Sequence, residues 1–369
     1  MTRFLRALPF WSSVLLLPIA WLAATRGGWF LAGVPIFGFF VMSVLDAMAG
    51  QEQSRTAEPG DPLFWYKFIT WIWLPIQLGV IFGVIWWIEG TSHLTTREAV
   101  FLMMGIGIVS GATGIVYAHE LIHRTNRWER RLGVWLMISC LYGHFATEHL
   151  AVHHRYVATP RDPATARYNE SFYHFFLRVL PGSFLSAWRT ESDRLRRNGK
   201  PVWALKNPFW VYWGGAALLL AVAWGIAGGW GVLLFSIQAF VAVLTLEQIN
   251  YVEHYGLVRK HLGEGRYEPV ATHHSWDSSH RMTNYLLINL QRHADHHMRP
   301  ALRYPLLSGQ DETGAPPLPA GYPLMSLIAY NPWLWRRMMN KRVRRWRSMF
   351  YPEIIDWQAY NSGELPMPR

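Results

Sequence analysis

The stretch Glu148-His-Leu-Ala-Val-His-His154 decides how this chain folds, because it places three imidazoles within six residues. His149 and His153 are four residues apart, so on an α-helix they share one face and suit a single metal ion. His154 is rotated by roughly 100° from His153, so it would reach a second metal ion or a neighbouring helix. The stretch therefore predicts a helix that supplies ligands to a metal site.

Other histidine clusters repeat this pattern. The stretch His119-Glu-Leu-Ile-His123 has the same four-residue step, His293-Ala-Asp-His-His297 ends in an adjacent pair, and His254 follows an apolar run. One metal ion takes about four to six ligands, so these clusters together predict two metal ions. Zinc normally takes three or four protein ligands, so the excess of imidazoles favours iron. The nine predicted ligands are His119, His123, His149, His153, His154, His254, His293, His296 and His297.

The composition favours a membrane protein. Of the 369 residues, 51% are hydrophobic, and the apolar residues are gathered in long runs. The single cysteine, Cys140, excludes a disulfide framework, a cysteine-ligated zinc site and an iron–sulfur centre carried by this chain. The net charge of +11 would suit nucleic acid, but its distribution around the apolar runs argues for membrane topology and against a nucleic-acid partner.

Six apolar runs are long enough to span a bilayer. With the N-terminus in the cytoplasm, the three external loops lie near residue 26, at residues 89–98 and near residue 228. Those loops hold only Arg26 and Arg97 of the 35 basic residues, as the positive-inside rule requires. Both termini are then predicted to be cytoplasmic. The six runs are residues 10–25, 29–48, 64–88, 100–118, 209–226 and 230–248.

Two further apolar segments need their own interpretation. Residues 133–147 are too few for a span, and crossing the membrane there would separate the histidine clusters, so we predict a buried or re-entrant helix. Residues 335–350 alternate apolar and basic residues at helical spacing, which predicts an amphipathic helix on the inner leaflet; a helix packed on the protein is the alternative.

The predicted fold is therefore all-α: a six-span transmembrane helical bundle with a cytoplasmic helical cap that carries the dimetal site. The parts are residues 1–118 with spans one to four, 119–208 as a cytoplasmic histidine-rich region with the buried or re-entrant helix, 209–249 with spans five and six, and 250–369 as the cap with the remaining ligands and the basic C-terminal helix.

A carboxylate adjoins a predicted ligand in each cluster: Glu120, Glu148, Glu253 and Asp295. A ligating histidine usually donates its second N–H to a carboxylate or carbonyl, so these acids are predicted to orient the rings. The pentapeptide 119–123 also matches H-E-x-x-H, the signature of zinc proteases, but a protease would leave most of the clustered histidines without a task. A metal transporter is a third class, and it would place its ligands in the middle of the spans.

These motifs resemble those of the integral-membrane di-iron desaturases and hydroxylases. The stretches Ala158-Thr-Pro-Arg-Asp-Pro-Ala-Thr165, Asn250-Tyr-Val-Glu-His-Tyr-Gly256 and Leu290-Gln-Arg-His-Ala-Asp-His-His297 closely resemble the alkane 1-monooxygenase family. The resemblance implies terminal hydroxylation of medium-chain n-alkanes with O2, two iron ions held by the nine histidines, and electrons from rubredoxin, which its reductase supplies. A membrane fatty acid desaturase or hydroxylase is the nearest alternative.

The resemblance also bears on residues beside the ligands. Asn250, four residues before His254, is expected to assist a metal through water, as in some desaturases. The family has a stretch similar to residues 273–280, whose histidines we interpret as supporting or structural residues: His273, His274 and His280. Arg292 and Arg299 adjoin the last cluster and are predicted to contact an acidic electron donor, because basic groups steer such a partner.

Overall fold

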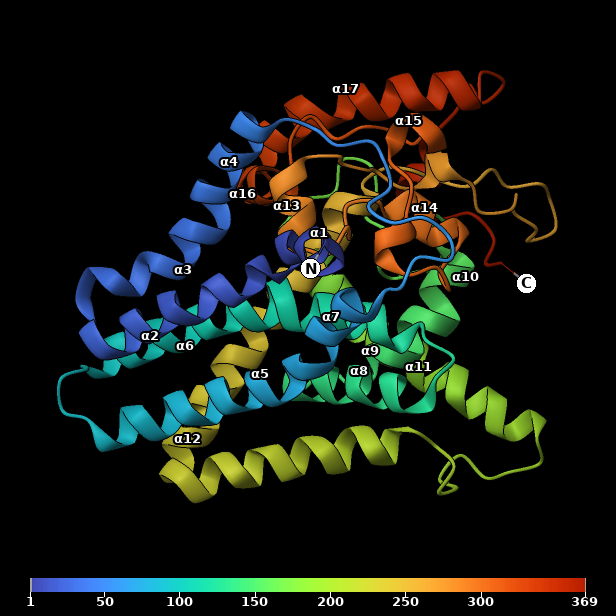
Figure 1. Ribbon diagram of the computed structural model, residues 1–369. Helices are drawn as coiled ribbons and strands as arrows, with labels where there is room; N and C mark the ends of the chain where they lie inside the picture. Colours follow the sequence, from blue (N-terminus) through green and yellow to red (C-terminus); the bar gives the residue numbers. More distant parts are fainter. Residues whose placement is uncertain (1, 369) are drawn as a thin grey trace.

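The computed structural model describes residues 2–368, and these residues form helices and no strand (Figure 1). The all-α prediction is confirmed. The α-helices are α1 Thr2–Ala7, α2 Leu16–Arg26, α3 Gly33–Pro35, α4 Met42–Ala49, α5 Phe64–Gly90, α6 Thr96–Val109, α7 Val116–Ile122, α8 Arg127–Ser139, α9 Phe145–Glu148, α10 His154–Tyr156, α11 Phe172–Arg197, α12 Phe209–His254, α13 Arg281–Leu286, α14 His293–Met298, α15 Gln310–Thr313, α16 Tyr322–Ala329, α17 Pro332–Phe350 and α18 Gln358–Ser362. The 3-10 helices are Leu8–Leu15, Gly28–Ala32, Thr272–His274 and Tyr304–Leu306, and the π-helices are Ile36–Val41, Ser110–Ile115 and His149–His153.

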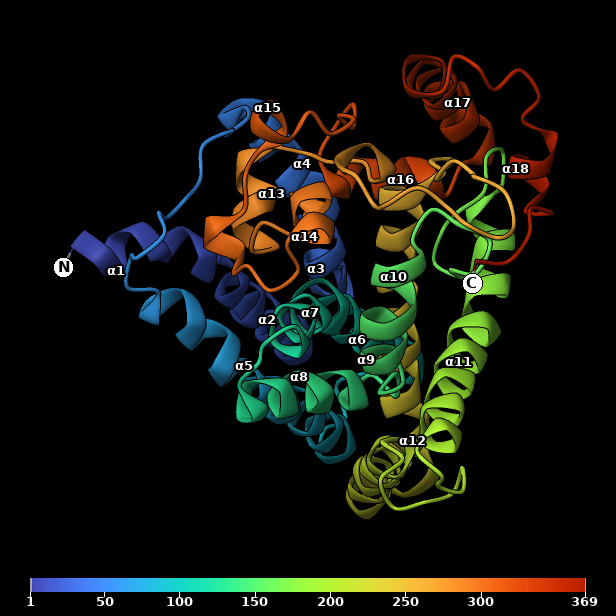
Figure 2. The same ribbon diagram turned by 90° about the vertical axis from the view of Figure 1, so that its right-hand side faces the viewer.

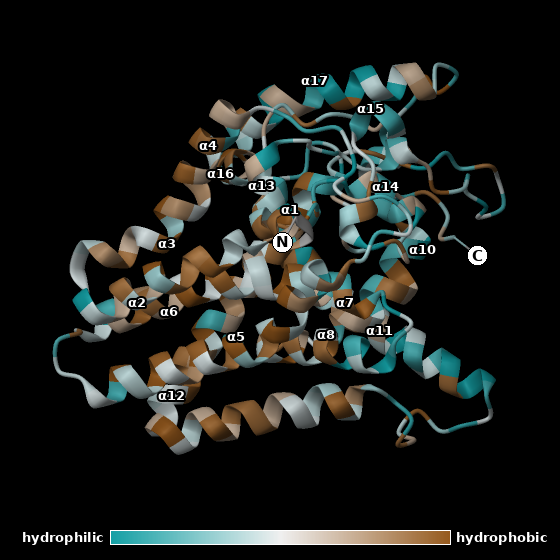
Figure 3. Ribbon diagram, viewed as in Figure 1, coloured by the Kyte–Doolittle hydropathy of each residue, from teal (hydrophilic) through white to brown (hydrophobic). Residues whose placement is uncertain are grey.

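Within the described chain, five helical segments are long and apolar enough to cross a membrane, and the longest of them, α12, contains a break. The last two predicted spans both lie in this 46-residue segment, whose backbone is non-helical at Ala227 and Gly228, so two helices meet there at a kink. The break falls between the predicted spans 209–226 and 230–248, and the count of six spans stays a prediction. Figure 3 shows hydrophobic residues concentrated on these long helices and hydrophilic residues over α15 and α17. The five helices are Phe4–Arg26, Gly28–Ala49, Phe64–Gly90, Thr96–Ile122 and Phe209–His254.

The turn in α12 lies at Ala227 and Gly228, where the sequence predicts an external loop. Gly228 has φ 56° and ψ −142°, a conformation that glycine adopts without a steric penalty. In Figure 1 this turn, the α2–α3 connection and the α5–α6 connection lie at the same end of the bundle, on the left. The cap and the C-terminus lie toward the opposite end.

The short apolar segment 133–147 forms the end of α8, a turn and α9. Residues Leu136, Met137 and Ile138 of α8 are fully buried. A side chain at Gly133 would lie 2.9 Å from the carbonyl oxygen of Ala118, so the glycine lets α8 pack closely on α7. The chain thus returns beside α7, which brings the α9 end close to the histidines of α7 (Figure 2).

The C-terminal helix α17 packs on the protein, which corrects the prediction that its apolar face lies on a membrane leaflet. Trp335 and Val343 are fully buried. The Trp335 ring lies 5.3 Å from that of Tyr255, and Val343 fills the space beside Gly256, where a Cβ would clash at 2.9 Å. The cap itself therefore covers the buried part of the apolar stripe. Among the basic residues of α17, Arg347 is buried and donates to the carbonyl oxygen of Gly256, whereas Arg337, Lys341, Arg344 and Arg345 are exposed.

Candidate metal centre

One of the three π-helical stretches, His149–His153, carries predicted ligands and changes how the ligands divide. A π-helix bonds i to i+5, so residues five apart share a face. In the π-helix His149–His153, His149 therefore aligns with His154. The expectation that His149 and His153 share one metal is wrong, because it assumed regular α-helical spacing. His153 projects to a different group.

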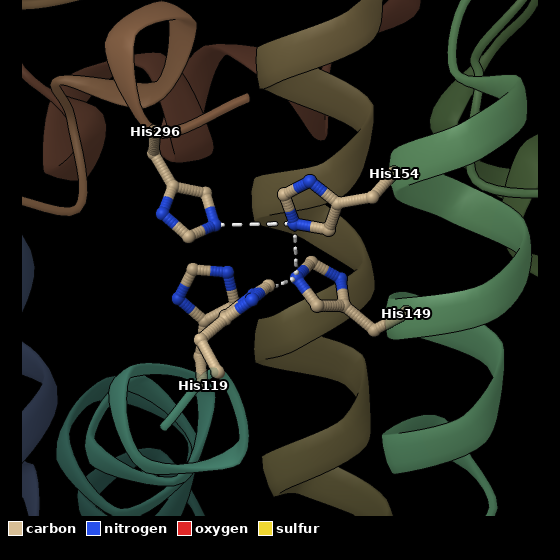
Figure 4. A group of neighbouring side chains, drawn as sticks. His119, His149, His154 and His296 are labelled. Carbon is tan, nitrogen blue, oxygen red and sulfur yellow. Dashed lines mark hydrogen bonds between the residues drawn. The ribbon is translucent and has the colours of Figure 1, made fainter. Parts of the chain in front are cut away.

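Five histidines from four helical segments converge on one point, and we call them the five-histidine group. The Nε2 atoms of His149 and His123 are 3.0 Å apart, as are those of His149 and His154, and His154 lies 3.2 Å from His296. Figure 4 shows the rings of His119, His149, His154 and His296 directed toward one another. The group consists of His119, His123, His149, His154 and His296, whose ligand atoms all lie within 4.8 Å of one another.

The other four histidines form the four-histidine group, and all four are buried. The Nε2 of His293 lies 3.1 Å from that of His254 and 2.9 Å from that of His297. His153 completes the set, with its ring 4.7 Å from that of His254. The structure thus brings together all nine histidines predicted from the sequence and divides them five and four.

These contacts fit metal ligation and do not fit hydrogen bonding. A ring nitrogen carries either one proton or one lone pair, so it makes one hydrogen bond. The Nε2 of His149 and the Nε2 of His293 each have two such neighbours. Two nitrogens about 2.1 Å from one metal ion and at right angles to each other would lie about 3.0 Å apart. The spacing therefore suits lone pairs that share a cation.

Burial also keeps the rings neutral. Desolvation first, and neighbouring imidazoles second, hold the pKa values of His149, His293 and His296 well below the usual range. The pKa values of His123, His154 and His297 are lowered by the same causes. Neutral imidazole is the form that binds zinc, iron, copper or nickel.

Asp162 is a supporting residue that the sequence reasoning missed. Its Oδ2 lies 3.0 Å from Nδ1 of His153 and accepts the hydroxyl of Thr165 at 2.7 Å. Burial alone would raise the pKa of Asp162, but His153 and Thr165 outweigh it and lower the value. The ionised carboxylate therefore fixes the proton of His153 on Nδ1 and leaves Nε2 for a metal. The sequence feature that could have identified Asp162 is its place in the Thr-Pro-Arg-Asp-Pro stretch. That stretch was interpreted only as part of the family resemblance.

Two of the predicted supporting acids pair with arginines instead. The carboxylate of Glu120 lies 3.7 Å from Arg124 and 3.8 Å from Arg303. Asp295 accepts two hydrogen bonds from Arg299 and one from the backbone N–H of Ser308. Because Glu120 faces these guanidinium groups, it is not placed as the general base of an H-E-x-x-H protease.

The remaining supporting residues lie close to the ligands. Oε2 of Glu253 is 3.3 Å from Nε2 of His293, and Tyr322 donates to Oε1 at 2.8 Å. Asn250 donates to Glu247 at 3.0 Å, so it has a carboxylate partner that the sequence did not predict. Glu148 is buried, and neither of its oxygens has a hydrogen-bond partner among residues 2–368.

Arg292 is buried, which corrects its prediction as a docking contact. Its guanidinium donates to the carbonyl oxygens of Leu307, Glu52 and Ser54 at 2.6–3.1 Å. It therefore ties the last histidine cluster to the segment after α4. Arg299 is exposed, but its guanidinium already donates to Asp295 and to the Ser308 hydroxyl.

Two of the other three predicted supporting histidines direct their side chains into a separate group, which we call the cap cluster, although the backbone of His274 lies beside the predicted ligand His254. The cap cluster consists of Glu268, His273, His274 and Tyr351. His274 Nδ1 accepts the backbone N–H of Ala271 at 2.9 Å, so its proton sits on Nε2, which lies 3.0 Å from Glu268. A protonated nitrogen cannot bind a metal. His280 contacts the Ser278 hydroxyl at 2.7 Å.

A largely apolar cavity, which we call the large cavity, reaches both histidine groups. Along α6 and α7 its lining runs from Ile108 to His119, about 16 Å at the helical rise per residue. Gly38 and Phe39, from the π-helix Ile36–Val41, line it from the second span. His149 and His293 line it as well, so space for an apolar chain meets the metal ligands of both groups.

Comparison with known proteins agrees with this site. Residues 95–325 match the family described as Fatty acid desaturase. The chain is 38% identical over 317 residues to alkane 1-monooxygenase 1 of Alcanivorax borkumensis, covering 85% of this chain and 78% of the relative. It is 36% identical over 350 residues to alkane 1-monooxygenase of Ectopseudomonas oleovorans, covering 94% and 84%.

A more distant relative is the xylene/toluene monooxygenase hydroxylase component XylM of Pseudomonas putida. It is 27% identical over 339 residues, covering 90% of this chain and 84% of the relative. The family matches, the membrane-length helices and the histidine groups together make this chain a membrane oxidoreductase. The chain belongs to the alkane 1-monooxygenase family, within the larger fatty acid desaturase family.

Proposed function

We propose that this enzyme hydroxylates the terminal carbon of medium-chain n-alkanes. The overall reaction converts an alkane, O2, two electrons and two protons into a 1-alkanol and water. The observation that carries the proposal is the large cavity, whose apolar lining meets His119, His149 and His293. An alkane has no polar handle, so an apolar space that fits its shape must supply the selectivity.

The protein positions the chain and excludes water. Gly38, Ile108 and Ala112 line the part of the large cavity between the spans, where they leave room for methylene groups. Their apolar surface displaces water from the chain and directs its end toward the ligands of both groups. A desaturase would instead need the chain to pass the metals, so that a mid-chain bond is presented.

The nine histidines would hold two iron ions, one in each group. The cofactor supplies the activation of O2 and the removal of hydrogen from a strong C–H bond. The chain's own contribution is a buried, neutral donor set, with Asp162 orienting His153 and Glu253 lying beside His293. Iron suits this reaction because zinc has no redox chemistry.

Electrons would come from rubredoxin, since the chain's single cysteine cannot hold a rubredoxin-type centre. We place the cap and both termini in the cytoplasm of a bacterial inner membrane, which agrees with the common end of the three turns in Figure 1. Arg299 and the exposed basic face of α17 would attract an acidic carrier. Turnover should fall as ionic strength rises, and Arg299→Glu should raise the KM for rubredoxin more than that for alkane.

The direct test is gas chromatography of octane or dodecane after incubation with purified protein, iron, rubredoxin, its reductase and NADH. The expected product is the 1-alkanol, with no product from the His149→Ala variant. Metal analysis should find two irons per chain. An alkene as the main product, or zinc as the metal that supports turnover, would refute the proposal.

A further inference from the structure

The loop between α11 and α12, residues 198–208, exposes apolar side chains and lysines at the point where a membrane-length helix begins. Trp203 is 60% exposed and Leu205 is 92% exposed, and both lie just before Phe209, the first residue of α12. In Figure 1 the loop lies beyond the end of this helix that is opposite the turn at Gly228, so it lies at a boundary of the membrane. We propose that this loop, which we call the lysine loop, binds the headgroups of acidic phospholipids and inserts Trp203 and Leu205 among the lipids.

Hydrogen bonds within the lysine loop hold its backbone in one conformation. Gly199 has φ 66° and ends α11, and the backbone N–H of Lys200 donates to the carbonyl oxygen of Leu195 at 2.9 Å. Asn207 is buried, and its amide donates to the carbonyl oxygen of Val202 at 2.9 Å. The two large apolar side chains are therefore displayed by an ordered loop. Because exposed apolar surface is unfavourable in water, their place beside a membrane-length helix indicates that lipid covers them.

Tryptophans around the lysine loop indicate its depth. The ring of Trp203 lies 5.1 Å from that of Trp188 on α11 and 5.9 Å from that of Trp210 on α12, and Trp213 lies 5.6 Å from Trp188. The indole N–H of Trp210 donates to the carbonyl oxygen of Trp203 at 3.3 Å. Tryptophan is enriched at the headgroup level of a bilayer, because its ring is apolar and its N–H is polar. The tryptophan group therefore places the loop among the headgroups.

The charges of the lysine loop select an acidic lipid. The side chains of Lys200 and Lys206 lie side by side, and this contact lowers the pKa of Lys200. Arg194 donates to the backbone carbonyl of Lys206 at 3.3 Å, and its own carboxylate partner is Glu191 at 2.6 Å. Within residues 2–368, neither lysine forms an ion pair with a carboxylate. Two adjacent ammonium groups repel each other, and a lipid phosphate between them would remove this repulsion.

A label at Leu205 tests the insertion. The single cysteine, Cys140, is buried, so Leu205→Cys provides one accessible thiol for an environment-sensitive dye. In nanodiscs of phosphatidylglycerol and phosphatidylcholine, we expect blue-shifted emission and quenching by lipids with brominated acyl chains. Ile355→Cys is the matched control, because Ile355 is 94% exposed but lies in the cap after α17, and its label should report water. A Leu205 label that is quenched only by iodide in the water, as at Ile355, would overturn the proposal.

Native mass spectrometry of the protein released from these nanodiscs tests the headgroup preference. A basic residue near an anionic surface strengthens binding about fivefold, so the double variant Lys200→Ala, Lys206→Ala should bind phosphatidylglycerol roughly 25-fold more weakly. Its binding of phosphatidylcholine should not change.

The matched control for this measurement is the double variant Lys341→Ala, Arg344→Ala. These two exposed cations lie on α17, far from the lysine loop in both Figure 1 and Figure 2, so their loss should leave the binding of phosphatidylglycerol unchanged. Equal binding of phosphatidylglycerol by the parent and the Lys200, Lys206 variant would contradict the assignment. Displacement of the lipid by inorganic phosphate would also contradict it. Neither test uses turnover, so both outcomes are independent of the reaction that the enzyme catalyses.

Discussion

His153 of the four-histidine group and His274 of the cap cluster are both buried, and each faces a carboxylate, yet only one is arranged to bind a metal. Asp162 accepts a hydrogen bond from the Nδ1–H of His153 at 3.0 Å, which leaves the Nε2 of His153 free to bind a metal. His274 uses Nδ1 to accept the N–H of Ala271, so its proton lies on Nε2 and is directed to Glu268. The two histidines differ in the partner of Nδ1, which decides whether Nε2 carries the proton or a free lone pair. The fold sets this partner.

The largest effects are expected when a histidine is replaced by alanine in each metal group and in the cap cluster. His296→Ala and His297→Ala change adjacent residues that serve different groups, and both should lower turnover by more than about 100-fold. His297→Ala leaves three ligands in its group, whereas His296→Ala leaves four, so His297→Ala should lose more metal. His274→Ala should keep both metals. Metal analysis and steady-state turnover on each purified variant provide the measurements.

Secondary structure supplies the control for these three variants. Each should keep the helical circular dichroism of the parent, because the long apolar helices stabilise the fold without the ligands. If His274→Ala lost one of two metals, the cap cluster would have to be counted as a metal site. Equal metal loss in His296→Ala and His297→Ala would contradict the division into five and four.

A smaller effect is expected from the carboxylate that orients His153. Asp162→Asn keeps an acceptor but removes the charge, and it should reduce metal affinity or turnover by about 10-fold; Asp162→Ala removes both and should cost up to about 100-fold. Metal titration and turnover check the order of the two variants. Asp193→Asn is the matched control, since that carboxylate is 58% exposed and lies on α11. Identical effects of the two Asp162 substitutions would mean that charge alone matters.

The sequence predicted the all-α fold and all nine histidines, because imidazoles clustered at the ends of apolar spans are typical of a metal site. It did not predict their division, since the π-helix His149–His153 cannot be distinguished from an α-helix by residue spacing. Asp162 was missed because its partnership with His153 depends on a turn rather than on helical periodicity. The break in α12 at Ala227 and Gly228 was located correctly, between the fifth and sixth predicted spans.

Contacts between segments far apart in the sequence also could not be predicted from the sequence. Arg292 adjoins the histidines in sequence, so it looked like a surface charge, but its partners come from residues 52–54 and 307. The apolar stripe of α17 has the periodicity of a helix that lies on a membrane. That periodicity is the same when the stripe packs on protein, as Trp335 does against Tyr255.

The smallest predicted effect concerns the cap cluster itself. Burial alone would raise the pKa of Glu268, but hydrogen bonds from His274, Tyr351 and the Lys260 backbone lower it to about 2, from an ordinary value of 4.5. A carboxylate with a depressed pKa stabilises the fold fully above pH 4.5, and this stability is lost as the pH falls toward 2. Glu268→Gln should therefore lower Tm by about 2–4 °C at neutral pH, and the difference from the parent should shrink between pH 5 and pH 3. Differential scanning fluorimetry in detergent across this range measures the gap. Metal content should stay at the parent level throughout, which separates this cluster from the two metal groups. A gap that persists unchanged at pH 3 would show that the charge of Glu268 contributes no stability and that shape alone holds the cluster.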